Sequence, residues 1–223
     1  MIYLKWKKKL KNKVIKNFLR QYTRKKKMND LEELVDLETD LKNQDINDSS
    51  ISNKHIKYIL FKDCSFNNIK MEKININDCF FENVKISSSA LINVNFENCT
   101  FKKCVIDNSK VSGSSFYKCK SFESEINDSL ITLSYYELNE FKKSIYKECN
   151  FKESKFENMK FRDCIFDYDK IHDNLLYKTY FENCDLLTSE FTLNAIDINY
   201  LKTSTISPAT ILQIANDLGI NIK

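Results

Sequence analysis

Glycine and proline are almost absent from this 223-residue chain, which has two glycines and one proline. Two glycines cannot supply the glycine-rich loops that cradle phosphates or dinucleotides, so those binding motifs are excluded. No run of 18 uncharged apolar residues exists, and the sequence therefore predicts no membrane-spanning helix. The two histidines, His55 and His172, have no cysteine or carboxylate at a metal or catalytic spacing. We expect a protein that is not an enzyme, with no metal site and no cofactor.

The net charge of +4 hides a strong asymmetry along the chain. Residues 1–27 contain twelve Lys or Arg and no acid, which leaves 23 bases against 31 acids in the remainder. Residues 28–60 carry a net charge of −5, and residues 61–223 carry −3. The sequence therefore predicts a basic N-terminal arm in front of a mildly acidic body.

The eight cysteines share a five-residue phase, because their separations are 15, 20, 5, 15, 30, 15 and 20 residues. No two cysteines are separated by the two residues that are typical of paired zinc ligands, and a disulfide framework has no reason to keep a five-residue phase. We interpret the cysteines as small buried thiols of a repeat. Reduced thiols indicate a cytoplasmic protein.

Phenylalanine follows the same phase. Thirteen of the sixteen Phe occupy positions that end in 1 or 6, where an even spread would place about three. Other apolar residues fill most of the gaps in this series, and only Ser121 breaks it. Two places earlier lies a mostly small residue, Cys, Ser, Thr or Asn. Two places later Asn recurs, a residue that tolerates left-handed backbone: Asn53, Asn68, Asn83, Asn93, Asn98, Asn108, Asn158 and Asn183.

A period of five is neither the strand period of 2 nor the helix period of 3.6. One large and one small inward side chain per pentad indicates a chain that turns a corner every five residues and coils around its own axis. Such a β-solenoid fills its interior with its own side chains. We therefore expect any function to lie on its outer faces.

The pattern resembles the pentapeptide-repeat family, whose loose consensus is small, polar, Leu or Phe, polar, polar. Matching pentads are Cys64-Ser65-Phe66-Asn67-Asn68, Cys99-Thr100-Phe101-Lys102-Lys103 and Cys149-Asn150-Phe151-Lys152-Glu153. The resemblance implies a right-handed, four-sided, all-β solenoid with four pentads per coil. Residues 46–206 would then form about eight coils and a rod roughly 40 Å long.

Both ends of the repeat have helical patterns. Residues 29–45 start with a capping box at Asn29–Glu32 and predict an acidic helix that caps the first coil. Residues 207–223 predict a C-terminal helix from Ser207-Pro208 to Gly219, followed by a short strand. The C-terminal end also resembles that of the quinolone-resistance members, which implies a homodimer of rods joined end to end. The candidate capping or dimerisation residues are Ile211, Ile214, Leu218 and Ile220.

Residues 1–28 predict a basic amphipathic helix, with Leu10, Val14, Phe18 and Tyr22 four residues apart. Three roles stay open for this arm, in decreasing order of expectation: packing against the first coil, contact with anionic lipid, and contact with nucleic acid. Met28 would serve as an alternative start. The candidate residues for contact with an anionic surface are Lys7, Lys8, Lys9, Arg24, Lys25, Lys26 and Lys27.

Two sets of outward residues are candidate partner-binding sites. The first is a column of acids and tyrosines whose regular rise would imitate a row of phosphates, although an ordinary mixed surface is the alternative. Its members are Glu97, Tyr117, Glu137, Glu157 and Tyr177. The second is Leu133 and Leu138, which mark either a partner surface or loops that leave the coil.

Two functions from different classes are open. The resemblance to the quinolone-resistance members implies a non-catalytic, DNA-mimicking rod that modulates or protects a type II topoisomerase, DNA gyrase or topoisomerase IV. The basic arm, which is not part of that pattern, favours a scaffold or immunity-type interaction protein at the inner face of the membrane. In both cases the partner is a protein, and direct nucleic-acid binding is the less expected activity.

Overall fold

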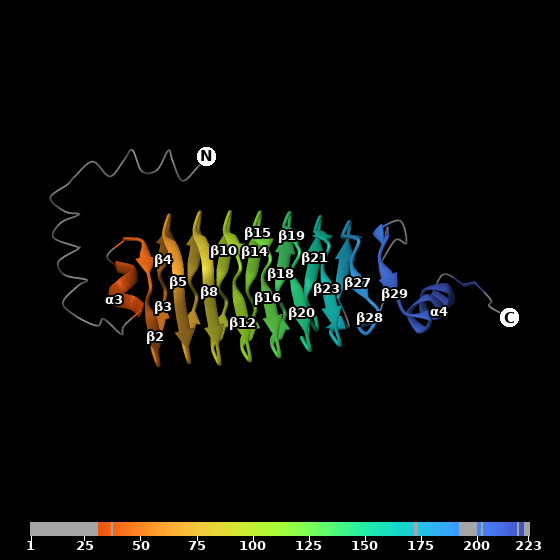
Figure 1. Cartoon of the computed structure of the whole chain (residues 1–223), viewed down its shortest axis with the longest axis horizontal. Helices are drawn as coiled ribbons and strands as arrows, with labels where there is room; N and C mark the ends of the chain where they lie inside the picture. Colours follow the sequence, from red (N-terminus) through yellow and green to blue (C-terminus); the bar gives the residue numbers. More distant parts are fainter. Residues whose placement is uncertain are drawn as a thin grey trace.

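The computed structural model describes residues 31–36, 38–171, 174–191, 200–201, 203–217 and 219–220. All strand pairs among these residues are parallel, and a strand pairs with those 20 residues before and after it. One coil is therefore 20 residues, or four pentads, and about eight coils stack into a rod (Figure 1). This is the four-sided, all-β solenoid that we expect from the five-residue repeat and from the resemblance to the pentapeptide-repeat family.

Each coil has four sides, which we number in chain order as faces 1 to 4. Face 1 consists of β1 (Leu41–Lys42), the first halves of β5 (Leu60–Asn67) and β8 (Phe80–Ser87), β11 (Thr100–Lys102), β15 (Lys120–Phe122), β19 (Glu140–Lys142), β22 (Lys160–Arg162) and β26 (Tyr180–Glu182). Face 2 consists of β2 (Asp45–Asn47), the second halves of β5 and β8, β12 (Val105–Asp107), β16 (Glu125–Asn127), β20 (Ile145–Lys147), β23 (Ile165–Asp167), β27 (Asp185–Leu186) and β29 (Thr205–Ile206).

Faces 3 and 4 complete the coil. Face 3 consists of β3 (Ser50–Ser52), β6 (Lys70–Glu72), β9 (Ala90–Ile92), β13 (Lys110–Ser112), β17 (Leu130–Thr132), β24 (Lys170–Ile171) and β28 (Glu190–Phe191). Face 4 consists of β4 (His55–Lys57), β7 (Asn75–Asn77), β10 (Asn95–Glu97), β14 (Ser115–Tyr117), β18 (Tyr135–Glu137), β21 (Lys155–Glu157) and β25 (Leu175–Tyr177). Between β17 and β24, the pairing of face 3 continues through parallel bridges of Asn150 to Leu130 and Lys170, and Ser154 then donates from its backbone N–H to Phe151 O in a turn.

The corners lie two residues after each inward apolar residue, and they have left-handed backbone. All eight asparagines that the repeat places there have positive φ, for example 54° at Asn53 and 44° at Asn108. This confirms the prediction, because Asn adopts this conformation more readily than other residues with a Cβ. The same conformation is imposed on residues that favour it less, including Leu133 and Leu138, both with φ of 55°.

The large inward residues stack along the axis. The rings of Phe61 and Phe81 lie 4.7 Å apart and those of Phe81 and Phe101 lie 5.0 Å apart, both nearly parallel. Ser121 continues this column without a change of register, since β15 pairs with β11 and β19 like its neighbours. The shared spacing of one coil explains why the sequence repeats so strictly: each inward group packs only against the equivalent groups above and below.

The small inward residues have a second task, which explains why they are Ser, Cys or Asn rather than Ala. Ser109 Oγ accepts a hydrogen bond from the backbone N–H of Ser89 at 3.1 Å and donates to the Asp107 carbonyl at 2.8 Å. Asn139 does the same, with its side-chain oxygen accepting from Cys119 N and its amide donating to Phe116 O. Without these side chains, the backbone N–H groups of Ser89 and Cys119 would be buried without a hydrogen-bond partner, which costs about 1–3 kcal/mol for each group.

The N-terminal end of the rod is covered by α3 (Leu31–Asp36), whose Leu31, Leu34 and Val35 are buried. Lys54 of the first coil fixes the helix, with its Nζ 2.9 Å from both Glu32 and Asp36. The helix is shorter than the predicted segment 29–45 because Leu41 already packs inward, paired in register with Phe61. The sheet therefore begins at Leu41.

The C-terminal end is α4 (Pro208–Asp217), which projects from the last coil (Figure 1). Its predicted caps are confirmed: Ser207 Oγ accepts from Thr210 N at 3.0 Å, and Gly219, with φ of 72°, donates to Asn216 O at 2.9 Å. The strand expected at 220–222 lies largely outside the described residues. No helix in the described ranges is long and apolar enough to cross a membrane.

Candidate partner-binding surfaces

The cysteines and histidines are the first candidates for chemistry in the part of the chain that the structure describes. No group of three or more His, Cys, Asp or Glu there is placed to hold a metal ion. All eight cysteines are free and buried, and burial raises the pKa of the Cys104 thiol to about 11 and that of Cys149 to about 12. Protonated, buried thiols are poor nucleophiles and metal ligands. His55 is exposed, and His172 lies outside the described residues.

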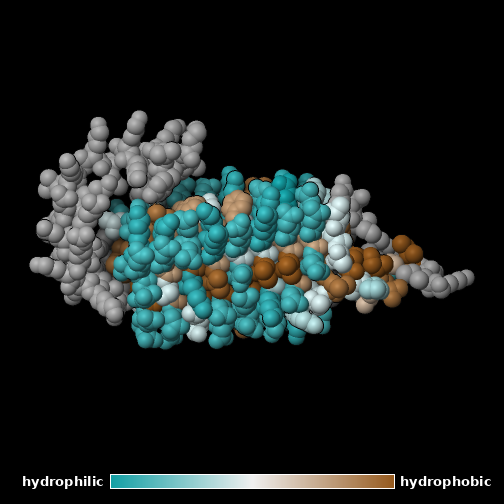
Figure 2. Space-filling view, viewed as in Figure 1, coloured by the Kyte–Doolittle hydropathy of each residue, from teal (hydrophilic) through white to brown (hydrophobic). Residues whose placement is uncertain are grey.

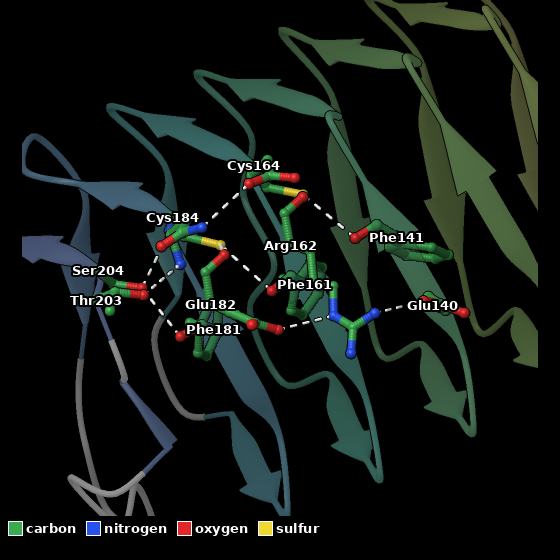
Figure 3. A network of polar contacts seen from close by, with 12 residues as sticks. Glu140, Phe141, Phe161, Arg162, Cys164, Phe181, Glu182, Cys184, Thr203 and Ser204 are labelled. Atoms are coloured by element: carbon green, nitrogen blue, oxygen red, sulfur yellow. Dashed lines mark hydrogen bonds and ion pairs between the residues drawn. The ribbon is translucent and has the colours of Figure 1, made fainter.

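Face 1 carries ion pairs that run from coil to coil. Arg162 Nε lies 2.8 Å from Glu182 on the next coil, and its Nη1 lies 3.2 Å from Glu140 on the preceding coil (Figure 3). Glu82 is held in the same way between Lys62 at 2.8 Å and Lys102 at 3.1 Å, and these lysines lower the pKa of Glu82. Glu82, Glu140 and Glu182 of face 1 are therefore each paired with a base.

The predicted acid and tyrosine column exists as a geometrical feature of face 4. Glu97, Tyr117, Glu137, Glu157 and Tyr177 are successive partners in the parallel register, so their side chains form one row. What the sequence alone does not predict is how the acids of this row are engaged by neighbouring groups.

Those acids are partly compensated by groups on the same face. Tyr135 donates from its hydroxyl to Glu137 at 2.9 Å and to Glu157 at 3.0 Å, and Lys155 lies 2.9 Å from Glu157. Contact with Lys155 and Tyr135 lowers the pKa of Glu157. The lysines at the corner beside the row, Lys118 and Lys178, lie over the rings of Tyr117 and Tyr177 at 4.7 and 5.1 Å. Face 4 is thus a mixed surface of tyrosines and ion pairs.

Leu133 and Leu138 lie at the two corners that border face 4. Both remain within the coil, because the N–H of Leu133 donates to Lys152 O at 3.2 Å and that of Leu138 to Glu157 O at 3.0 Å. The prediction of loops that leave the coil is therefore wrong for Leu133 and Leu138. Their side chains instead form an exposed apolar surface. The side chain of Leu133 is 60% exposed and that of Leu138 is 45% exposed.

Face 2 is the face on which acidic residues outnumber bases most strongly. We define the acidic face as face 2 together with the corner that follows it; its acids are Asp45, Asp48, Asp107, Glu125, Asp128, Glu148, Asp167 and Asp185. The same positions contain two bases, Lys85 and Lys147, which leaves a net charge of −6. The carboxylates of Glu125, Asp128 and Glu148 have no ion pair or hydrogen bond with other described residues.

Sequence reasoning missed the acidic face, although a signal was present. Summing the charges of outward positions over the 20-residue coil, instead of following one column, separates this face from the balanced faces. Apolar residues also lie along it: Ile145 pairs in register with Ile165, which is 43% exposed. Figure 2 looks onto this side of the rod and shows an interrupted line of hydrophobic side chains between hydrophilic ones.

Sequence reasoning also missed a surface groove of about 660 Å³ at the corner between faces 4 and 1. Its wall is mixed, with Tyr58 and Phe80 beside Lys62, Asp78 and Glu82. Phe80 directly precedes the inward Phe81, and this pair of adjacent aromatics was the available signal.

The predicted C-terminal residues are only partly described. Ile211 is 42% exposed, and Ile220 and the neighbouring Leu212 are also exposed, whereas Thr210 and Ala215 are buried. The apolar side chain of Ile211 is therefore partly accessible. The side chain of Ile214 and the whole of Leu218 lie outside the described residues, as do the seven basic residues of the arm.

The five-residue repeat and the four-sided coil together define the class of fold: the described chain is a four-sided β-helix built from five-residue repeats. A trypsin-treated form of QnrB1, a plasmid-mediated fluoroquinolone resistance protein, is similar in structure at 14% identity, with 82% of this chain and 91% of the other covered and a TM-score of 0.38. HetL, a pentapeptide repeat protein involved in heterocyst differentiation regulation in the cyanobacterium Nostoc, has 8% identity, coverages of 84% and 92%, and a TM-score of 0.28.

Full-length QnrB1 gives 16% identity, with 82% of this chain and 98% of the other covered, and a TM-score of 0.30. No protein-family model matches the chain, and no curated protein matches it in sequence. Similarities at these identities and TM-scores carry no argument about function. The function must therefore be argued from the surfaces of this chain.

Proposed function

We propose that this protein is a non-catalytic rod that binds a basic partner protein through its acidic face. The observation that carries the proposal is the group of three exposed acids Glu125, Asp128 and Glu148, whose charges no other described residue neutralises. Carboxylates without a nearby base give this surface a negative electrostatic potential, which attracts and orients a basic protein. The acids of face 1, by contrast, are held by Arg162, Lys62 and Lys102.

The partner to test first is a type II topoisomerase, DNA gyrase or topoisomerase IV, because the sequence pattern resembles that of quinolone-resistance members that mimic DNA. Duplex DNA carries one charge per about 1.7 Å of its axis. The acidic face carries eight carboxylates over eight coils of about 4.8 Å each, or one per about 5 Å. The rod therefore imitates only a part of the charge of DNA, and exposed side chains such as Ile165 must add to the binding.

A supercoiling assay with purified gyrase, and a decatenation assay with topoisomerase IV, test this function in the presence and absence of a quinolone. We expect inhibition or drug protection at micromolar protein. The variant Glu125→Lys/Asp128→Lys/Glu148→Lys should lose at least about tenfold in potency, because three favourable charges become repulsive. A matched control, Asp78→Lys/Glu97→Lys/Glu153→Lys, makes the same charge change on face 4 and its corners and should retain the effect. Absence of any effect of the natural chain at micromolar concentration would contradict the topoisomerase assignment.

A second candidate function is a scaffold or immunity-type interaction protein held at the inner membrane face. The twelve bases of residues 1–27, interleaved with Trp6, Phe18 and Tyr22, favour it. Co-sedimentation with anionic vesicles, with and without residues 1–27, tests it. Equal recovery of both forms would exclude this role.

We also propose that the rod forms a homodimer through α4 in the cytoplasm. Ile211 and Leu212 support this proposal, since they place two exposed apolar side chains on one short helix at the end of the rod. Sedimentation equilibrium of Ile211→Glu/Leu212→Glu tests the interface: the natural chain should sediment as a dimer and the variant as a monomer. A natural chain that is monomeric at micromolar concentration would refute it.

A further inference from the structure

We propose that residues 1–27 of this chain bind its own acidic face, and so occupy the surface that a basic partner would use. The binding of the arm does not depend on the proposed function; only the competition with a partner does. The proposal starts from two features that are opposite in charge and otherwise unexplained: an arm of twelve bases without an acid, and a face with a net charge of −6.

The charge of the acidic face lies where a neighbouring segment can reach it. Glu125 points outward from β16, while Asp128 and Glu148 lie at successive corners of the same edge, and all three are exposed. Since no described residue pairs with them, a cation that binds there does not have to replace an existing ion pair. On face 1 it would have to replace one, because Glu140 and Glu182 already hold Arg162.

The acidic face also offers apolar contact. Ile145 and Ile165 lie side by side on adjacent coils, and Leu187 on the next coil is 48% exposed. The corner before face 2 carries Glu123, Lys143 and Asp163 on successive coils, and the corner after it carries Asp128 and Glu148. Figure 2 shows a broken line of hydrophobic side chains with hydrophilic side chains on both sides of it. Such a surface fits a segment with an apolar stripe flanked by bases.

The arm has the matching composition. Leu10, Val14, Phe18 and Tyr22 recur every four residues, and Lys or Arg occupy many of the positions between them. In a helix, this spacing would place the four apolar side chains on one side and bases at its margins.

The arm is also long enough. The described chain begins at Leu31, at the same end of the rod as β2. Ile165 is six coils beyond Asp45, or about 29 Å along the axis at one strand spacing per coil. A helix of 27 residues is about 40 Å long, and an extended chain is longer. The basic segment can therefore reach the isoleucines without leaving the acidic face.

Photo-cross-linking in the full-length chain tests the proposal without any partner. Benzoylphenylalanine placed at Phe18 should cross-link to residues of the acidic face, located by fragment mass spectrometry. Mixing isotopically labelled with unlabelled chains distinguishes binding within a chain from binding between chains. We expect links within one chain, and fewer of them as salt is raised from 0.05 to 0.5 M. Links mapped to faces 1, 3 or 4, links only between chains, or no links would overturn the proposal.

The two charge-reversal variants complete the test, since both raise the net charge by six and each changes two corner residues and one strand residue. Glu125→Lys/Asp128→Lys/Glu148→Lys should reduce the cross-link yield by about tenfold. Asp78→Lys/Glu97→Lys/Glu153→Lys should leave it within about twofold. Circular dichroism verifies that both remain folded. Equal losses in the two variants would show that the arm responds to net charge alone, which would refute a specific acidic-face site. Failure of the topoisomerase assay with cross-linking intact would refute only the proposed partner.

Discussion

Asp169 accepts a hydrogen bond from the backbone N–H of Cys149 through Oδ1, with the two atoms 2.7 Å apart, and its other oxygen has no partner. The side chain is fully buried at an inward corner. Asn139, at the equivalent position of a pentad one and a half coils nearer the N-terminus and on the opposite side of the rod, uses its amide to donate to Phe116 O. An ionised carboxylate cannot donate, so a protonated Asp169 fits this corner better.

Stability is therefore expected to fall as the pH rises past the range in which Asp169 binds its proton. Burial raises the pKa of Asp169 from 3.8 to about 7 in the folded protein. The folded state then holds a proton that the unfolded state releases above pH 4, so this contribution to stability is complete below about pH 4 and is lost progressively up to about pH 7. The free energy of unfolding should decrease by about 2–3 kcal/mol between pH 5 and pH 8. Urea denaturation at the two pH values measures it.

Asp169→Asn should remove most of this pH dependence and stabilise the protein at pH 8, because the amide can both accept and donate at the corner. The converse change, Asn139→Asp, should introduce a similar dependence at the equivalent position. A pH profile that Asp169→Asn leaves unaltered would show that other groups cause it.

Leu133→Asn should stabilise the protein by about 1 kcal/mol, because Asn adopts the left-handed backbone that Leu133 holds at φ of 55°. Leu130→Asn is the matched control, since Leu130 is an exposed strand residue without positive φ. The control should give no gain. Thermal unfolding compares the two, and an equal gain in both would mean that solubility rather than backbone conformation is responsible.

Phe161→Ala should destabilise the rod by about 3–5 kcal/mol. Its ring is buried, stacks on Phe181 at 5.1 Å and meets Phe166 edge-on at 5.3 Å. Phe122 points outward from β15, and Phe122→Ala should cost less than about 1 kcal/mol. Chemical denaturation of both variants separates the inward from the outward position; similar losses would be inconsistent with the register.

The sequence predicts the fold well because one geometrical rule acts at every pentad. The phase of Phe61, Phe81 and Phe101 predicts the inward column, and the recurrence of Asn at the corners predicts left-handed backbone there. The caps at Ser207 and Gly219 were also predictable, because they depend only on neighbouring residues.

The surface is harder to predict, because its properties depend on which side chains meet across coils. The charges of Glu137 and Glu157 look alike in the sequence, yet Tyr135 and Lys155 engage them in the structure. Glu125 and Asp128 remain without such partners. The sequence around Leu133 and Leu138 is compatible with both an exposed surface and a loop. A loop of five or ten residues would keep the five-residue phase, so the phase does not show whether the chain leaves the coil.

The assignment of side chains to the interior and to the four faces is the claim on which every surface proposal depends, and thiol titration tests it most directly. In the folded, reduced full-length protein, a charged thiol reagent should modify none of the eight cysteines at the rate of a free thiol, and all eight should react after denaturation, because burial both shields them and raises the pKa of groups such as Cys104. Rapid modification of several cysteines in the native protein would contradict the fold and, with it, the positions of the acidic face and of face 4.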